Sequence, residues 1–128
     1  MRPKSAKTLL PMSKADLYWL AGLWEGEGTI RLQSRNFHNK NGKRYGPYSY
    51  PRASIGMTDR DVIEHVGRIL GVGKMYTSHT HASPGHEKPF YTWVVSTTKD
   101  VQALAALLYP LMGMRRQAQF AVVLGWDL

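Results

Sequence analysis

The chain has 128 residues and a formal charge of +8, from 17 lysines and arginines against nine acidic residues. This length suits one domain with a single modest core, and the lack of cysteine excludes disulfides and thiolate zinc sites. No apolar run approaches the ~20 residues that span a bilayer, and the basic N-terminus lacks the apolar segment of a secretory signal. We therefore expect an intracellular protein of a reducing compartment, with neither a membrane nor a small-molecule substrate as partner.

Residues 1–13 are expected to form a basic arm, and residues 14–128 the folded domain. The first predicted helix covers residues 14–26. Ser13 is its expected N-cap, with Asp16 at the third helical position as in a capping box. Its apolar side chains recur at helical spacing and are expected in the core: Leu17, Leu20, Ala21 and Trp24.

Alternating residues then predict a strand over 29–35, a polar hairpin loop over 36–47 and a return strand over 48–57. Arg31, Gln33 and Arg35 share one face of the first strand, opposite Ile30, Leu32 and Ser34. On the return strand, Ala53, Ile55 and Met57 are expected to face the core. Arg52 and Ser54 are expected on the same face as the arginines of the first strand, which makes that face basic.

No acidic residue lies between Gly28 and Thr58, whereas basic residues and tyrosines alternate through that segment. A patch of one sign is the usual footprint of nucleic-acid binding, while solubility alone tends to mix signs. Since arginine pairs with guanine and glutamine with adenine, the expected base contacts are Arg31, Gln33, Arg35, Arg52, Ser54 and Tyr76. Those in the hairpin loop are expected to meet phosphates or outer bases: Lys40, Lys43 and Arg44.

The second half repeats the order of helix and two strands. A helix is predicted over 58–73, capped by Thr58 or Asp59, then strands over 74–78 and 90–96, and helices over 97–110 and 115–126. The strand residues expected to continue the basic face are Lys74, Tyr76 and Ser78. The histidines at 79, 81 and 86 are expected in a solvated hairpin rather than a zinc site. These elements predict an α+β fold: a four-stranded antiparallel sheet with helices on one face.

The first helix ends on two carboxylates, Glu25 and Glu27, where its dipole disfavours negative charge by about 0.3–1 kcal/mol. One interpretation is an ordinary helix end with exposed glutamates. Another interpretation is that these carboxylates bind a divalent cation, since Mg²⁺ takes one or two carboxylates together with phosphate. Gly22 and Gly26 lie four apart and leave a bare stripe, which favours close packing of the same helix from a second subunit about a two-fold axis.

The segment "LAGLWEGEG", residues 20–28, closely resembles the signature of the LAGLIDADG homing endonucleases. The element order also resembles that family over nearly the whole chain. With one motif per chain, the resemblance implies a homodimer through Gly22, Leu23 and Gly26, and strands lying in the DNA major groove. It also implies Mg²⁺-dependent cleavage of a long, imperfectly palindromic intron or intein target with 3′ overhangs; Mn²⁺ is expected to substitute. Glu27 would hold the metal, joined by the Gly26 carbonyl.

The chain departs from the family pattern at two places. Thr58 or Asp59 stands where members often place a water-positioning glutamine. Met114 stands where a lysine is common, so Arg115 or Arg116 is expected to contact the reacting phosphate. Two alternatives therefore stay open: a DNA-binding module without cleavage, and an RNA maturase that assists intron folding.

Overall fold

The computed structural model describes residues 9, 11–79 and 88–126. Most of the expected basic arm, together with His81 and His86, lies outside these residues. The elements in chain order are α1 (Lys14–Glu27), β1 (Gly28–His38), β2 (Arg44–Met57), α2 (Arg60–Leu70), β3 (Lys74–His79), β4 (Pro89–Val95), α3 (Thr98–Leu108), the short 3₁₀ helix η2 (Tyr109–Leu111) and α4 (Met114–Leu124). Within the described part of the chain, no helix is long and apolar enough to cross a membrane.

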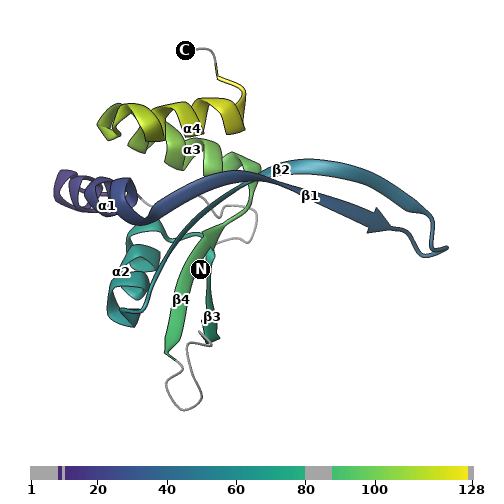
Figure 1. Cartoon of the computed structure of the whole chain (residues 1–128), viewed down its shortest axis with the longest axis horizontal. Coiled ribbons are helices and arrows are strands. Elements are labelled where there is room, and N and C mark those ends of the chain that lie inside the picture. The colour runs from purple at the N-terminus through teal and green to yellow at the C-terminus, as the bar shows by residue number, and fades with distance from the viewer. Residues whose placement is uncertain (1–8, 10, 80–87, 127–128) are drawn as a thin grey trace.

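The strands form one antiparallel sheet in the order β1-β2-β4-β3. The helices gather around one end of the β1–β2 hairpin, which curves away from them as a long ribbon (Figure 1). The four antiparallel strands and the helices packed with them confirm the predicted α+β fold. The curved sheet leaves one face uncovered, opposite the face that carries the core.

The core lies between the helices and the inward face of the sheet. Trp24 of α1 is the largest fully buried side chain, at 1% exposure, and it packs in one cluster with Ile55 of β2 and Val66 of α2. Ala53 and Ile55 are buried while Met57 packs against the cluster, as their alternation predicts. Leu9 and Met12 also pack against the core, so the end of the expected arm belongs to the folded body.

The ends of the helices follow local chemistry. The Ser13 hydroxyl accepts a hydrogen bond from the Asp16 backbone N–H at 3.1 Å, which confirms the predicted cap of α1. Asp59 occupies the N-cap position of α2, although its side chain makes no capping hydrogen bond. Gly71 ends α2 with a φ of 72°, a left-handed conformation that glycine adopts without steric cost.

The predicted loop over 36–47 is wrong, because both strands continue into it. β1 runs to His38 and β2 begins at Arg44, so only a short turn remains. Asn39 closes this turn: its side-chain oxygen accepts from the backbone N–H of Asn41 at 2.9 Å and of Lys43 at 2.8 Å. The polar composition arises because the ribbon extends beyond the core, and every residue from 34 to 49 is exposed. Leu32, on the apolar side of the alternation, is likewise 53% exposed.

Candidate nucleic-acid interface

The strand register places the predicted basic residues on one face of the sheet. Residues directly opposite on antiparallel strands share a face. Arg31 lies opposite Arg52, and both Ser54 and Lys74 lie opposite Val94. Val94 is 7% exposed yet stands outside the core cluster, because it lies under the polar side chains of the outer face. By alternation along β3, Tyr76 and Ser78 share this face with Lys74, as predicted.

Arg31 and Arg52 are cross-strand neighbours of like charge, and Gln33 joins them. In the amide orientation that pairs every donor with an acceptor, the Gln33 oxygen accepts from Arg31 Nη2 at 3.1 Å and from Arg52 Nη1 at 2.9 Å. The Gln33 nitrogen then donates to the Tyr50 hydroxyl at 2.9 Å. Gln33 therefore holds two guanidinium groups side by side on the outer face, in addition to any base contact of its own.

Aromatic residues line a hollow beside this group. The hollow is bounded by Gln33, Arg35, Phe37, Tyr48, Tyr50, Arg52, Tyr76, Val94 and Ser96. The rings of Phe37 and Tyr48 pack at 5.6 Å between centroids, and the Arg35 guanidinium carbon lies 5.8 Å from the Phe37 ring. Phe37 and Tyr48 were not among the residues expected at the interface, because the first strand was predicted to end at Arg35, and the pairing of β1 with β2 shifts register between Arg35 and Phe37.

The hairpin turn carries the residues expected to meet phosphates. Lys40, Lys43 and Arg44 are all exposed, and the Lys43 amine lies 5.6 Å from the centre of the Tyr45 ring. Exposed cations at the end of a projecting ribbon can neutralise phosphates without disturbing any packed residue. The structure therefore leaves these three side chains accessible to the contact expected of them.

Glu27, the expected metal ligand, is exposed at the last residue of α1. It lines a second hollow together with Thr29, Arg31, Arg52, Ser54, Gly56, Phe90 and Thr92. Among residues 9, 11–79 and 88–126, Glu27 takes part in no ion pair, and no three potential metal-ligating side chains cluster. One chain thus brings a free carboxylate beside two of the predicted DNA-contacting arginines.

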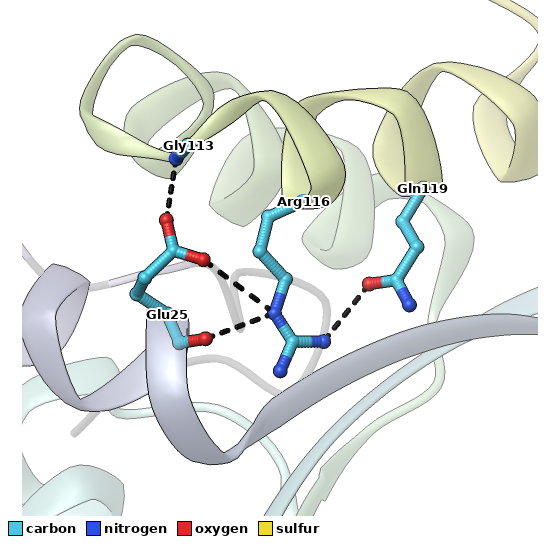
Figure 2. A network of polar contacts seen from close by, with 4 residues as sticks. All are labelled: Glu25, Gly113, Arg116 and Gln119. Atoms are coloured by element: carbon cyan, nitrogen blue, oxygen red, sulfur yellow. Dashed lines mark hydrogen bonds and ion pairs between the residues drawn. The ribbon is translucent and has the colours of Figure 1, made fainter.

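Glu25 is placed differently from Glu27, because it is engaged with α4 (Figure 2). Its Oε1 accepts a hydrogen bond from the backbone N–H of Gly113, the N-cap residue of α4. Arg116 Nε donates to the Glu25 backbone carbonyl at 3.0 Å and lies 3.8 Å from Glu25 Oε2. Arg116 Nη1 also donates to Gln119 Oε1 at 3.0 Å. We call these four residues the α1–α4 latch.

The latch explains why a carboxylate is tolerated at the end of α1. The start of α4 carries the positive end of its own dipole, and a carboxylate there is stabilised by roughly 0.3–1 kcal/mol. Arg116, only 7% exposed, supplies a cation at the C-terminus of α1 and satisfies one of its carbonyl groups. Glu25 thus serves as a structural charge that joins the end of α1 to α4.

The other predicted catalytic residues occupy different places in the fold. Arg115 is exposed beside the latch, and Met114 is 87% exposed. Thr58 and Asp59 are exposed between β2 and α2, and neither lines the hollow that holds Glu27. The structure thus brings the Met114–Arg116 segment to the end of α1, whereas Arg116 itself is directed to Glu25. Direct catalytic contacts for these residues stay predictions.

The glycine stripe of α1 faces outward. Gly22 and Gly26 are exposed, and a Cβ built on either would meet no described residue within 4 Å beyond the adjacent backbone of α1 itself. Leu23 is half-buried and packs against the core. Tyr18, one turn before Gly22, is 58% exposed. The part of the chain that the structure describes therefore gives neither glycine a packing partner, which leaves the stripe open to contact by another molecule.

Comparison with known proteins identifies the fold. No protein-family model matches the sequence, and no curated protein matches it either. Two solved structures of the homing endonuclease I-CvuI with DNA, one with Mg and one with Ca, match at TM-scores of 0.61 and 0.62. Both are 20% identical, covering 88% and 87% of this chain and 65% and 64% of theirs.

A third neighbour is the archaeal intron-encoded homing endonuclease I-Vdi141I, also complexed with DNA. It matches at a TM-score of 0.58 and 19% identity, over 87% of this chain and 67% of that chain. The chain thus spans about two thirds of the length of these neighbours. The shared architecture confirms the fold that the residues 20–28 predict: this chain has the fold of the LAGLIDADG homing endonucleases.

Proposed function

We propose that the chain is a site-specific endonuclease that cleaves double-stranded DNA as a homodimer. One observation carries the proposal: the free carboxylate of Glu27 opens into the same hollow as Arg31 and Arg52. A carboxylate beside two guanidinium groups suits a phosphodiester, whose negative oxygens both a cation and the arginines would neutralise. The DNA complexes of the neighbouring homing endonucleases support the same kind of partner.

The shape of the ribbon supports binding in the major groove. A two-stranded β-ribbon fits that groove, where base edges present distinct donors and acceptors. The exposed segment 34–49 lacks a core of its own, and an isolated hairpin is marginally stable in water. Contact with DNA would cover the basic and aromatic side chains that this ribbon exposes.

The residues present fit a hard divalent cation. Glu27 is exposed and free of an ion pair in the described chain, and oxygen donors with few protein ligands are what Mg²⁺ prefers. Glu27 and the Gly26 carbonyl would hold Mg²⁺, with Mn²⁺ as substitute. When bound, the metal would polarise the phosphate, acidify an attacking water and stabilise the leaving oxygen. Arg31 and Arg52 would hold the DNA backbone or a base beside it.

The open glycine stripe supports the homodimer. Two α1 helices packed at Gly22 and Gly26 about a two-fold axis would bring both Glu27 side chains near that axis, one for each DNA strand. Such an arrangement suits a long, imperfectly palindromic target and cuts that leave 3′ overhangs. The expected setting is an intron or intein whose spread depends on that cut.

The test is a selection of cleaved sites from a partially palindromic DNA library, run with Mg²⁺ and with Mn²⁺. We expect one enriched site whose sequenced ends carry 3′ overhangs. Glu27→Gln should abolish cutting and spare DNA binding. Glu64→Gln is the matched control, because Glu64 lies on α2 in an exposed ion pair with Arg60 at 2.6 Å. This control variant should cut normally. Unchanged cutting by Glu27→Gln would refute the assigned ligand.

The exposed Met114, in place of the lysine common in the family, favours a DNA-binding module as the second candidate. A selection of bound sites from the same library separates the two: a site that is bound in both metals but not cleaved indicates the module. Preference for structured intron RNA over duplex DNA in a competition assay would instead indicate a maturase.

A further inference from the structure

The α1–α4 latch lies immediately beside the expected metal ligand. Its contacts converge on Glu25, two residues before Glu27 (Figure 2). Arg116 is buried, and its guanidinium is oriented by the Glu25 carbonyl on one side and by Gln119 on the other. A side chain held in this way has little freedom to reach a phosphate, but it fixes the backbone that it binds.

The other side of Glu27 is fixed as well. The Gly28 backbone N–H donates to the carbonyl of Trp24, and a Cβ at Gly28 would lie 2.3 Å from the Trp24 ring. The chain therefore enters β1 pressed against a fully buried indole. Glu27 lies between two anchored points, Glu25 at the latch and Gly28 on Trp24, with only its side chain free.

We propose that Arg116 and Glu25 are positioning residues, which hold the Glu25–Glu27 turn so that the Glu27 carboxylate is presented to the metal. This inference rests on the proposed function and assigns Arg116 a role other than direct phosphate contact. It also gives the two carboxylates of the motif different roles: Glu25 binds α4, and Glu27 alone is available to bind a cation. Partners that orient a metal ligand typically change affinity or activity by about 10-fold to 100-fold when they are removed.

The first experiment measures amide hydrogen exchange by NMR in metal-free protein. Arg116→Met should speed exchange at Gly26, Glu27 and Gly28 by about 10-fold or more, relative to amides of α2. Arg116→Lys should restore part of this protection, because an amine still donates to the Glu25 carbonyl. Arg68→Met is the matched control, since Arg68 is exposed on α2. Equal acceleration of all amides, or none, would overturn the proposal.

The second experiment measures Mn²⁺ binding to the protein on its selected DNA by electron paramagnetic resonance. Arg116→Met should raise the half-saturating Mn²⁺ concentration by about 10-fold or more while DNA affinity without metal changes little. Unchanged Mn²⁺ binding with a lower cleavage rate would overturn positioning and favour direct phosphate contact. A wild-type complex that binds no Mn²⁺ would refute the proposed function, whereas the exchange experiment still decides whether the latch anchors the turn.

If Arg116→Met fails to fold, Gln119→Ala provides the same test in milder form. It removes one acceptor of the guanidinium and leaves both contacts of Arg116 with Glu25. We expect smaller changes in the same direction in both experiments. No change in either measurement would count against the latch.

Discussion

Replacing Gly22 by alanine should stabilise α1 if this face of the helix meets water, and should weaken the dimer if it packs against the same helix of a second subunit. The substitution adds one methyl group to the middle of α1, at a position where the described residues place no atom within 4 Å apart from the helix's own adjacent backbone. Alanine is favoured over glycine in a helix interior by about 0.8–1.0 kcal/mol. A solvent-facing stripe therefore predicts a more stable protein, with a melting temperature higher by about 3–6 °C for a domain of this size.

The dimer predicts a different outcome. A two-fold axis through the stripe brings two added methyl groups into one closely packed contact, and each overpacked group costs about 1–3 kcal/mol. The sum of about 2–6 kcal/mol corresponds to a dimer dissociation constant raised by roughly 30-fold to 10⁴-fold. Contact between subunits would supply this cost, since no neighbouring element among residues 9, 11–79 and 88–126 opposes the methyl group.

Analytical ultracentrifugation over a range of protein concentrations measures the dissociation constant, and circular dichroism follows unfolding at concentrations where the chain is monomeric. We expect Gly22→Ala to be a weaker dimer built from a more stable monomer. Gly22 avoids the ambiguity of Gly26, whose carbonyl is an expected metal ligand. A more stable variant with unchanged self-association would refute the helix-to-helix dimer.

The remaining predictions concern the start of β1 and the basic face. Gly28→Ala should destabilise the monomer by about 1–3 kcal/mol in thermal unfolding, because its Cβ meets the buried Trp24 ring; a neutral result would contradict the close contact. Gln33→Leu should lower the free energy of unfolding by about 0.5–1.5 kcal/mol, since two guanidinium groups lose a shared acceptor. Gln33→Glu should raise the free energy of unfolding and weaken DNA binding. Denaturant titration measures the stability of each variant, and binding isotherms measure its affinity for DNA. Lys43→Ala should reduce the slope of log affinity against log salt by about 0.9 for each subunit, hence about 1.8 for the proposed homodimer, and an unchanged slope would show that Lys43 meets no phosphate.

The sequence predicts the elements best where local chemistry and tertiary packing agree. The Ser13 cap and the spacing of Leu20 and Trp24 identify α1. Leu20, Ala21 and Trp24 are buried as expected, and Leu17 is half-buried against the core. Alternation also assigns the faces of β1 and β2 correctly where the helices cover them. It fails to predict burial from Leu32 onward, because the polar ribbon has no buried face and its composition resembles that of a loop.

The latch could not be predicted from the sequence, because it joins residues 88 and 91 positions apart. Arg116 carries no local sign that its guanidinium turns inward, and the family resemblance directs attention to the phosphate instead. Glu25 offered the one signal, as a carboxylate at the wrong end of a helix. A carboxylate at that position indicates that some other group compensates its charge, but it does not identify the group. The fold shows that the group is the start of α4.

The ribbon from 34 to 49 also bears on how target preference can change. Since none of these residues is buried, a substitution there removes no core contact and should leave folding nearly intact. Substitutions near Glu27, Gly28 and Trp24 would instead disturb packed residues. New sequence preferences could therefore accumulate along the ribbon one substitution at a time, while the hydrolytic centre stays as it is, and a protein engineer seeking a new target would begin there.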